Sequence, residues 1–115
     1  MTIKDKYKLS FAKTNENGKI FFICNNLGNI DCQRIANKIN QMHIIECEGL
    51  LNEIIETQKG NYFEEYFALD NDEASDEDQL RISPPNIIIN LATKIPLEDM
   101  KNLLMEWIDF VKNSK

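Results

Sequence analysis

The feature that most constrains the fold is a run of apolar residues at helical spacing near the C-terminus. The run consists of Leu97, Met100, Leu104, Trp107, Ile108 and Val111, which form one stripe on an α-helix. Pro96 suits the first turn of this helix, because a first-turn nitrogen needs no hydrogen-bond partner. Leu103 and Phe110 widen the stripe on one flank, and Met105 lies off the other. We expect an amphipathic helix packed on a sheet. A second interpretation is that Phe110 and Met105 border a dimer or partner surface.

Alternating residues predict a β-hairpin near the N-terminus. Tyr7, Leu9 and Phe11 alternate with polar or smaller residues, which indicates a strand with one wet face. The sequence Asn-Glu-Asn-Gly at residues 15–18 suits a turn, since Asn and Gly accept positive φ readily. The apolar run at residues 19–24 follows as a second, more buried strand. The chain is therefore expected to begin with a strand.

Two stretches at helical spacing follow this hairpin. Asp31 is placed to cap the first helix by accepting backbone N–H bonds, with Ile30 and Ile35 as a hydrophobic staple around the cap. The apolar positions of the two helices are Cys32, Ile35, Ala36, Ile39 and Met42, and then Cys47, Leu50, Leu51, Ile54 and Ile55. Gly60 suits the C-terminal end of the second helix. Residues 42–48 fit a short link, a strand or part of one bent helix.

Two further strands are expected before the C-terminal helix. Residues 61–69 are rich in aromatic side chains, which favours a strand. Residues 70–81 are expected to form a polar loop, and residues 82–91 a strand that begins at a sheet edge because of Pro84 and Pro85. The order ββααββα predicts an α+β fold with a small, largely antiparallel sheet. The length predicts a single domain over residues 1–115.

The net charge of −6 is concentrated in one segment. Eight acidic residues and no basic residue lie between positions 64 and 78, namely Glu64, Glu65, Asp70, Asp72, Glu73, Asp76, Glu77 and Asp78. The rest of the chain carries eleven acidic and thirteen basic residues. Mutual repulsion favours an extended acidic loop at about residues 70–81. This loop is either a solvated stretch that aids solubility or a docking surface for a basic partner, with Tyr62 and Tyr66 as anchors.

The acidic segment does not match a calcium-binding loop. If such a loop began at Asp70, its sixth position would need Gly and its twelfth Glu, but Ser75 and Arg81 stand there. Nucleic-acid binding is not expected either. The chain is acidic, its basic residues are scattered, and its aromatic cluster has acidic neighbours.

The residues that catalysis would need are sparse. His43 and Cys47 are four apart and could share a helix face, which suggests a thiol with a base or two metal ligands. A structural zinc site needs four ligands, and Cys24, Cys32 and Cys47 lack the usual paired spacing. No phosphate-binding or hydrolase motif occurs. We therefore expect no enzymatic activity, no cofactor and no metal, with His43 partly buried and the three thiols reduced and mostly buried.

The compartment expected from the sequence is the cytoplasm. The N-terminus is polar and no apolar segment follows it, so no signal peptide is expected. The longest apolar runs, residues 20–24 and 87–89, fall far short of the ~20 residues that a membrane-spanning helix needs.

The last quarter of the chain carries a resemblance to a known class of proteins. It combines PPN at residues 84–86, an apolar strand, IPLE at residues 95–98 and WIDF at residues 107–110. This pattern resembles small immunity proteins of bacterial contact-dependent growth inhibition and other polymorphic toxin systems. The resemblance implies a cytoplasmic inhibitor that binds the toxic domain of a cognate effector, often a nuclease. A nuclease has a basic groove for nucleic acid, which the acidic segment could occupy by imitating phosphate charge.

The same pattern also resembles type III secretion chaperones of the Tir-chaperone kind. Those proteins are likewise small, acidic and α+β, and they act as dimers on an effector segment. They usually begin with a helix, whereas a strand is expected here, so the immunity protein is the preferred interpretation. The sequence leaves open whether the chain is a monomer or a homodimer.

Overall fold

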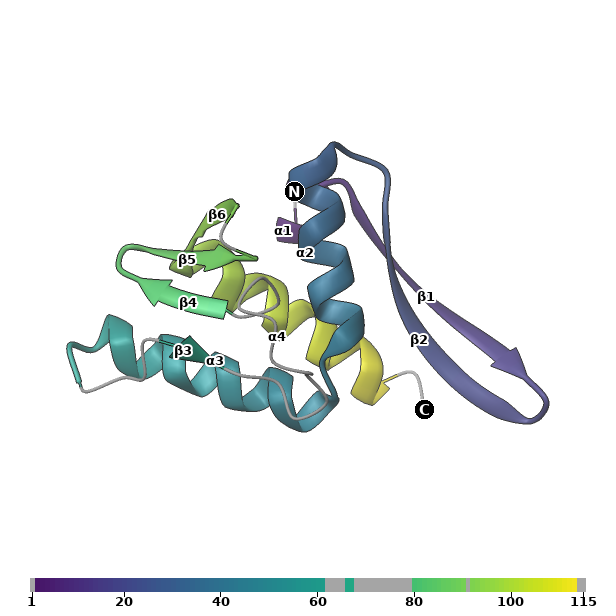
Figure 1. Cartoon of the computed structure of the whole chain (residues 1–115). Coiled ribbons are helices and arrows are strands. Elements are labelled where there is room, and N and C mark those ends of the chain that lie inside the picture. Colours follow the sequence, from purple (N-terminus) through teal and green to yellow (C-terminus); the bar gives the residue numbers. More distant parts are fainter. Residues whose placement is uncertain (1, 62–65, 68–79, 91, 114–115) are drawn as a thin grey trace.

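The computed structural model describes residues 2–61, 66–67, 80–90 and 92–113. In chain order, the elements are α1 (Ile3–Lys6), β1 (Leu9–Glu16), β2 (Lys19–Asn26), α2 (Ile30–Gln41), α3 (Ile44–Gln58), β3 (Tyr66–Phe67), β4 (Leu80–Ser83), β5 (Asn86–Ile89), β6 (Thr93–Pro96) and α4 (Leu97–Asn113) (Figure 1). The expected α+β class and the C-terminal helix are confirmed.

The strands form two separate antiparallel sheets instead of the single sheet expected. β1 and β2 pair as a long hairpin that projects from the rest of the molecule (Figure 1). β3, β4, β5 and β6 pair in chain order as an antiparallel meander. The prediction of a single sheet was wrong because strand periodicity identifies strands but does not say which of them pair.

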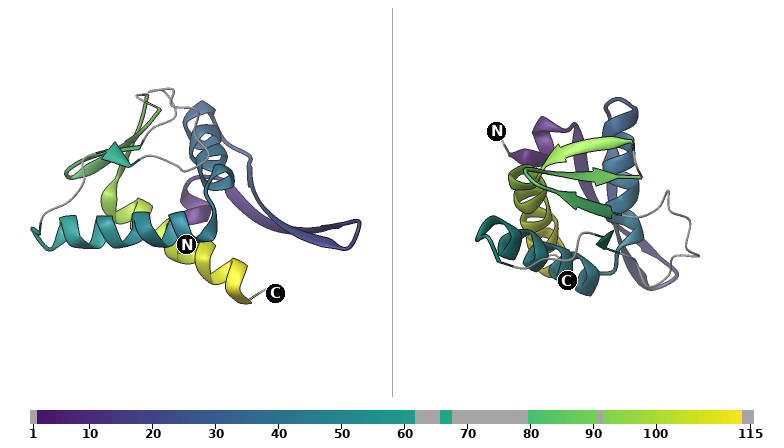
Figure 2. Two further views of the ribbon diagram at one scale, coloured as in Figure 1. Left: turned by 60° about the horizontal axis from the view of Figure 1, so that its bottom comes forward. Right: turned by 60° about the vertical axis from the view of Figure 1, so that its left-hand side comes forward.

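Helices cover one face of the four-stranded sheet. In the right-hand view of Figure 2, this sheet lies in front of α4 and α2. Residues alternate along its strands, so Leu80, Ile82, Ile87, Ile89 and Ile95 are buried between the sheet and the helices. The helices contribute Ile35, Ile39, Leu50, Ile54, Met100, Leu103 and Leu104 to the same core.

Two expected local structures are confirmed. The hairpin turns at Asn17 and Gly18, whose φ angles are 53° and 82°, as a two-residue loop of this kind requires. Helix α3 ends at Gln58, and Gly60, just beyond the C-cap Lys59, has a φ of 81°. The N–H groups of Gly60 and Asn61 donate to carbonyls in the last turn of α3, so these two bonds complete the helix terminus.

The cap of α2 is Asn29 and not Asp31. The Oδ1 atom of Asn29 accepts a hydrogen bond from the N–H of Cys32 at 3.0 Å. Asp31 lies within the helix and accepts a bond from the hydroxyl of Thr93 at 2.8 Å. Ile30 is 57% exposed, so the expected hydrophobic staple does not form. Asp31 thus attaches α2 to β6 instead of starting the helix.

The single strand expected over residues 82–91 is a hairpin. Pro84 and Pro85, joined by a cis peptide bond, form the two-residue turn between β4 and β5. These positions need no ladder hydrogen bond, so the missing N–H of proline is tolerated. Leu80 and Arg81, expected in the polar loop, belong to β4. Pro96 ends β6, and α4 begins at the next residue.

The chain begins with a one-turn helix and not with a strand. Tyr7 ends α1, and Lys8, with a φ of 59°, turns the chain into β1. The two carboxylate oxygens of Glu106 in α4 accept bonds from the N–H groups of Ile3 and Lys4, at 2.9 and 3.0 Å. This contact is with a residue about a hundred positions away, so local periodicity could not predict the helix.

Candidate interaction surface

The projecting hairpin is anchored to α4 by four aromatic side chains. Phe11 of β1 meets the edge of Trp107 with ring centroids 5.0 Å apart. Phe110 packs 5.6 Å from Phe11 and 5.9 Å from Phe22 of β2. Such edge-to-face and tilted pairs stabilise beyond simple burial. Phe110, expected at the border of a partner surface, thus packs against the hairpin, while Met105 is 50% exposed.

The outer edge of β2 is attached to α2 at one residue. The N–H of Cys24 donates to Oδ1 of Asn40 at 2.8 Å, and Nδ2 of Asn40 donates to the carbonyl oxygen of Cys24 at 2.9 Å. The side-chain amide therefore takes the place of a neighbouring strand. In an antiparallel ladder, every second residue of a strand turns its backbone N–H and C=O away from the paired strand. Cys24 turns these groups away from β1, so Phe22 and Ile20 do the same.

The edge of β2 is open at those two residues. Within the described residues, the outward backbone groups of Ile20 and Phe22 have no hydrogen-bond partner. The open stretch is bounded by Cys24, which is paired with Asn40, and by the turn residue Gly18. An unpaired strand edge of this kind is a site at which another strand can add.

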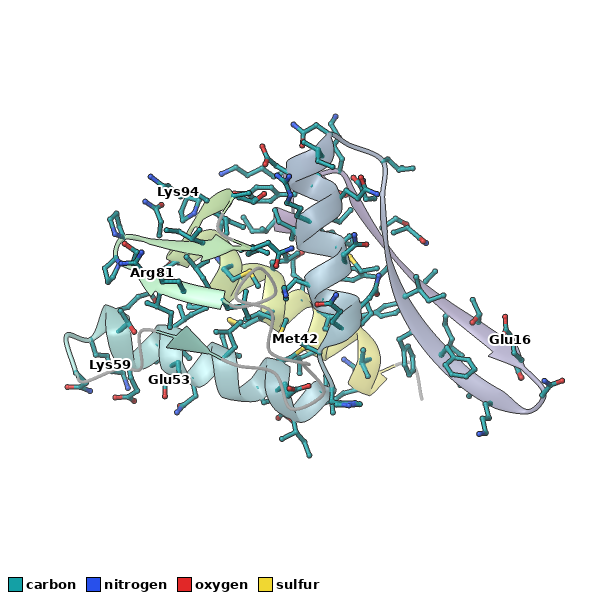
Figure 3. The ribbon with its side chains drawn as sticks, viewed as in Figure 1. Glu16, Met42, Glu53, Lys59, Arg81 and Lys94 are labelled. Carbon is teal, nitrogen blue, oxygen red and sulfur yellow. The ribbon has the colours of Figure 1, made fainter. Side chains whose placement is uncertain are left out.

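An apolar groove of about 230 Å³ lies beside this open edge. Its walls are Ile20, Phe21, Phe22, Ile39, Asn40, Met42, Ile44, Trp107 and Val111. Ile20 and Phe21 are each 46% exposed. Figure 3 places Met42 at the end of α2 and Glu16 at the far end of the hairpin, so the hairpin extends well beyond the helices that form the groove. Exposed apolar residues around a groove are typical of protein-binding surfaces.

The face of the four-stranded sheet that points away from the helices carries basic residues. The strand register places Arg81, Ile88 and Lys94 in one row across β4, β5 and β6. Figure 3 shows Arg81 and Lys94 on the same side of the molecule, away from the hairpin. Lys94 is exposed, and Arg81 is half-buried.

Most of the predicted docking residues lie outside the described residues. These are Tyr62, Glu64, Glu65, Asp70, Asp72, Glu73, Asp76, Glu77 and Asp78. Tyr66 belongs to β3, where its backbone pairs with that of Arg81. Phe67 pairs with Leu80 in the same two strands. Phe67 and Leu80 are therefore neighbours in the sheet, and in the sequence they flank residues 68–79, which include six acidic residues.

The positions of His43 and Cys47 do not suit a pair of reactive groups. His43 is exposed and caps α3, and its backbone N–H donates to Oε1 of Glu46 at 2.9 Å. The sequence predicts a partly buried His43, and this prediction is wrong. Cys47 is completely buried, which raises the pKa of its thiol to about 12. Such a thiol is protonated at neutral pH and is a poor nucleophile.

The other thiols are also buried. Cys24, Cys32 and Cys47 form no disulfide, as expected, and burial raises the pKa of Cys24 to about 12. Among the side chains that the structure describes, no group of three or more His, Cys, Asp or Glu could hold a metal ion. No helix in the described ranges has both the length and the apolar character to cross a membrane.

A second pocket, of about 630 Å³, lies between α3, the β4–β5 turn and α4. All three prolines of the chain line it, together with Thr57, Gln58, Leu97 and Glu98. Nε2 of Gln58 donates to Glu98 at 2.8 Å, so the two helices are joined at its rim. Among the residues that line this pocket, Glu98 is the one with an acidic or basic side chain.

A partly buried cluster of polar side chains joins the N-terminal residues to the start of α4. Oδ2 of Asp99 accepts hydrogen bonds from Nζ of Lys6 at 2.8 Å and from the hydroxyl of Tyr7 at 2.6 Å. Burial, and then the hydrogen bond to Asp99, raises the pKa of Tyr7 well above its ordinary value. The cluster fixes α1 against α4 and leaves Tyr7 protonated.

Sequence reasoning did not single out the open edge of β2. The sequence predicts a more buried strand over residues 19–24, yet only Cys24 in that range is buried. One signal was present: the run is apolar at consecutive positions, whereas a two-stranded hairpin has only one face to pack on a core. Phe21, which points to the opposite face from Phe22 and Cys24, therefore had to remain uncovered by the core.

Comparison of the chain with models of protein families, with curated proteins and with solved structures finds no match.

Proposed function

We propose that the chain is a cytoplasmic binding protein that neutralises a cognate bacterial toxin domain by direct contact. The observation that carries this proposal is the pairing of Phe67 with Leu80. These two residues flank residues 68–79 in the sequence, a stretch that includes six acidic residues. A concentrated negative charge beside a folded sheet is suited to a partner with a basic surface.

The resemblance of residues 83–110 to immunity proteins supports the same proposal. In the structure those residues run from the end of β4 through β5 and β6 and along most of α4. Two of these strands, β5 and β6, belong to the same sheet as Phe67 and Leu80, the described residues that flank the acidic stretch. A partner such as a nuclease has a basic groove, which the carboxylates of that segment would occupy in place of phosphate groups.

The experiment that tests the proposal captures the partner and then measures its activity. The purified chain serves as bait in a lysate of its native host, with washes at low and high salt, and bound chains are identified by mass spectrometry. The expected result is a large secreted effector bound through its C-terminal domain. The toxic activity of that isolated domain should then disappear when an equimolar amount of the chain is added.

Two results would overturn the proposal. One is a captured domain that keeps its full activity in the complex. The other is capture of a secretion substrate through an unfolded N-terminal segment, which is the behaviour of a type III secretion chaperone and not of an inhibitor.

A further inference from the structure

The open edge of β2 has a self-complementary pattern of backbone hydrogen-bond donors and acceptors. At Ile20 and Phe22 the backbone presents an N–H and a C=O outward, and within the described residues these groups have no hydrogen-bond partner. An added antiparallel strand must offer two outward-facing residues at the same spacing. The edge of β2 in a second copy of the chain offers such a pair.

Only one register of two copies uses both open residues. Pairing Phe22 with itself would place Ile20 opposite Cys24, whose backbone groups already bond to Asn40. Pairing Ile20 with itself would place Phe22 opposite Gly18, which is in the turn with a φ of 82°. The remaining register pairs Ile20 of each copy with Phe22 of the other and makes four backbone hydrogen bonds.

From this geometry we infer that the chain forms a homodimer in which two β2 strands pair antiparallel about a two-fold axis at Phe21. The two hairpins then form one continuous four-stranded sheet. The dimer has the closed two-fold symmetry that most homo-oligomers adopt.

The side chains at this interface are suited to a second copy. Paired residues on neighbouring strands point to the same face, so Ile20 of the second copy lies next to Phe22. Phe22 lines the 230 Å³ apolar groove and packs against Phe110. Each copy therefore inserts an isoleucine side chain into the groove of the other. Phe21, which is 46% exposed, meets Phe21 of the second copy across the axis.

Charge does not oppose this pairing. Residues 20–24 carry no charge, and Lys19 falls opposite Ile23 of the second copy, so the register pairs no like charges. Gly18 of the second copy falls opposite Cys24, whose outward backbone groups already bond to Asn40. The second strand therefore leaves the ladder at its turn, and a glycine there brings no side chain against the Asn40 amide.

A disulfide at the axis gives the sharpest test. In the proposed register, Phe21 is a non-hydrogen-bonded pair with itself, and the Cα atoms of such a pair are about 4.5 Å apart, within the range that a disulfide spans. Phe21→Cys should form a covalent dimer under mild oxidation. The matched control is Thr14→Cys, since Thr14 lies directly opposite Phe21 on β1, away from the interface. The native thiols are buried and are expected to remain unreacted.

A second test removes a single edge N–H. Ile20→Pro deletes a donor that the β1–β2 ladder does not use, and it should weaken dimerisation by about tenfold or more as measured by light scattering over a concentration series. The control is Asn15→Pro on the opposite edge of the hairpin, since Asn15 pairs with Ile20. It should leave the dimer intact, and circular dichroism establishes that both variants are folded.

The dimer is overturned if the unmodified chain is monomeric at every concentration up to its solubility limit. It is also overturned if Thr14→Cys crosslinks as readily as Phe21→Cys, or if the two proline variants weaken dimerisation equally. The proposal of toxin neutralisation rests on a different edge of the molecule. A monomer that neutralises a toxin would therefore overturn only the dimer, and a dimer that neutralises no toxin would overturn only the proposed function.

Discussion

The side-chain amide of Asn40 pairs with both backbone groups of Cys24, at 2.8 and 2.9 Å. This pair fastens the end of α2 to the hairpin, beside the aromatic contacts of Phe11 and Phe22 with α4. It also closes the edge of β2 at one residue. The hairpin is thus held at its base from two directions, and its outer half extends beyond the helices (Figure 1).

The first prediction concerns the stability that this pair supplies. Asn40→Ala leaves the N–H and C=O of buried Cys24 without their partners and should lower the free energy of unfolding by about 1–2 kcal/mol. Asn37→Ala, at an exposed position of the same helix, is the control. Denaturant unfolding monitored by circular dichroism measures both. Equal losses in the two variants would refute the role assigned to Asn40.

The second prediction concerns the attachment of α1. Glu106→Ala removes the acceptor for the N–H groups of Ile3 and Lys4, so hydrogen exchange at these two amides should become faster. The free energy of unfolding should fall by about 1–2 kcal/mol. Asp109→Ala is the control, because Asp109 bonds only to Asn113 of the same helix in the described residues. Unchanged exchange at Ile3 and Lys4 would contradict the contact.

The third prediction is a pH dependence at Asp99. Burial opposes ionisation of this carboxyl, but the hydrogen bonds from Lys6 and Tyr7 together outweigh burial, so its pKa lies below the ordinary value. A carboxyl whose pKa is lower in the folded state stabilises the fold above its unfolded pKa of about 4, and this contribution is lost as pH falls through the folded pKa.

Comparison with Asp99→Asn measures that dependence. The difference in unfolding free energy between the unmodified chain and the variant should be largest at neutral pH and should shrink below about pH 4. Tyr7→Phe removes one of the two donors and keeps the carboxyl, so it should retain part of the dependence. Urea unfolding at a series of pH values measures these free energies. If the difference between the unmodified chain and Asp99→Asn stays constant with pH, the stabilising role of the Asp99 carboxylate is refuted.

The fourth prediction concerns association with the proposed toxin domain. Changing Asp72 and Asp76 to Asn, and Glu73 and Glu77 to Gln, should slow association by about tenfold at low salt and flatten its salt dependence. Stopped-flow mixing at several salt concentrations measures both.

The control for this experiment changes net charge equally, elsewhere on the surface. Its four substitutions are Asp5→Asn, Glu16→Gln, Glu48→Gln and Asp109→Asn. If the control slows association as much as the test variant does, net charge and not the acidic segment governs the encounter. An unchanged rate in the test variant would remove this mechanism, though not the inhibitory role.

The local elements of this fold could be predicted where the chemistry is local. The Asn-Gly turn and the glycine just beyond the end of α3 follow from conformations that few residues adopt. The β4–β5 turn was missed although a signal existed. Ile82 and Ile87 are an odd number of residues apart, so one strand could not bury both, and the change of phase marks the turn at Pro84 and Pro85.

Other features depend on contacts that no local pattern reveals. Asn29 and Asp31 are both good helix caps, and the hydroxyl of Thr93 determines which of them is free to act as one. The open edge of β2 depends on Asn40 reaching Cys24 and on the two sheets being separate. A sequence pattern identifies a strand, but only tertiary contacts determine which of its edges is covered.

The attachment of α1 to α4 also has a consequence for how the protein is made. Glu106 and Asp99 contact residues that left the ribosome some ninety to a hundred positions earlier. The β1–β2 hairpin can form while synthesis continues, because the contacts between its strands are local. Helix α1 gains these partners only after α4 has been made. We therefore expect the docking of α1 to be a late step in the assembly of this fold.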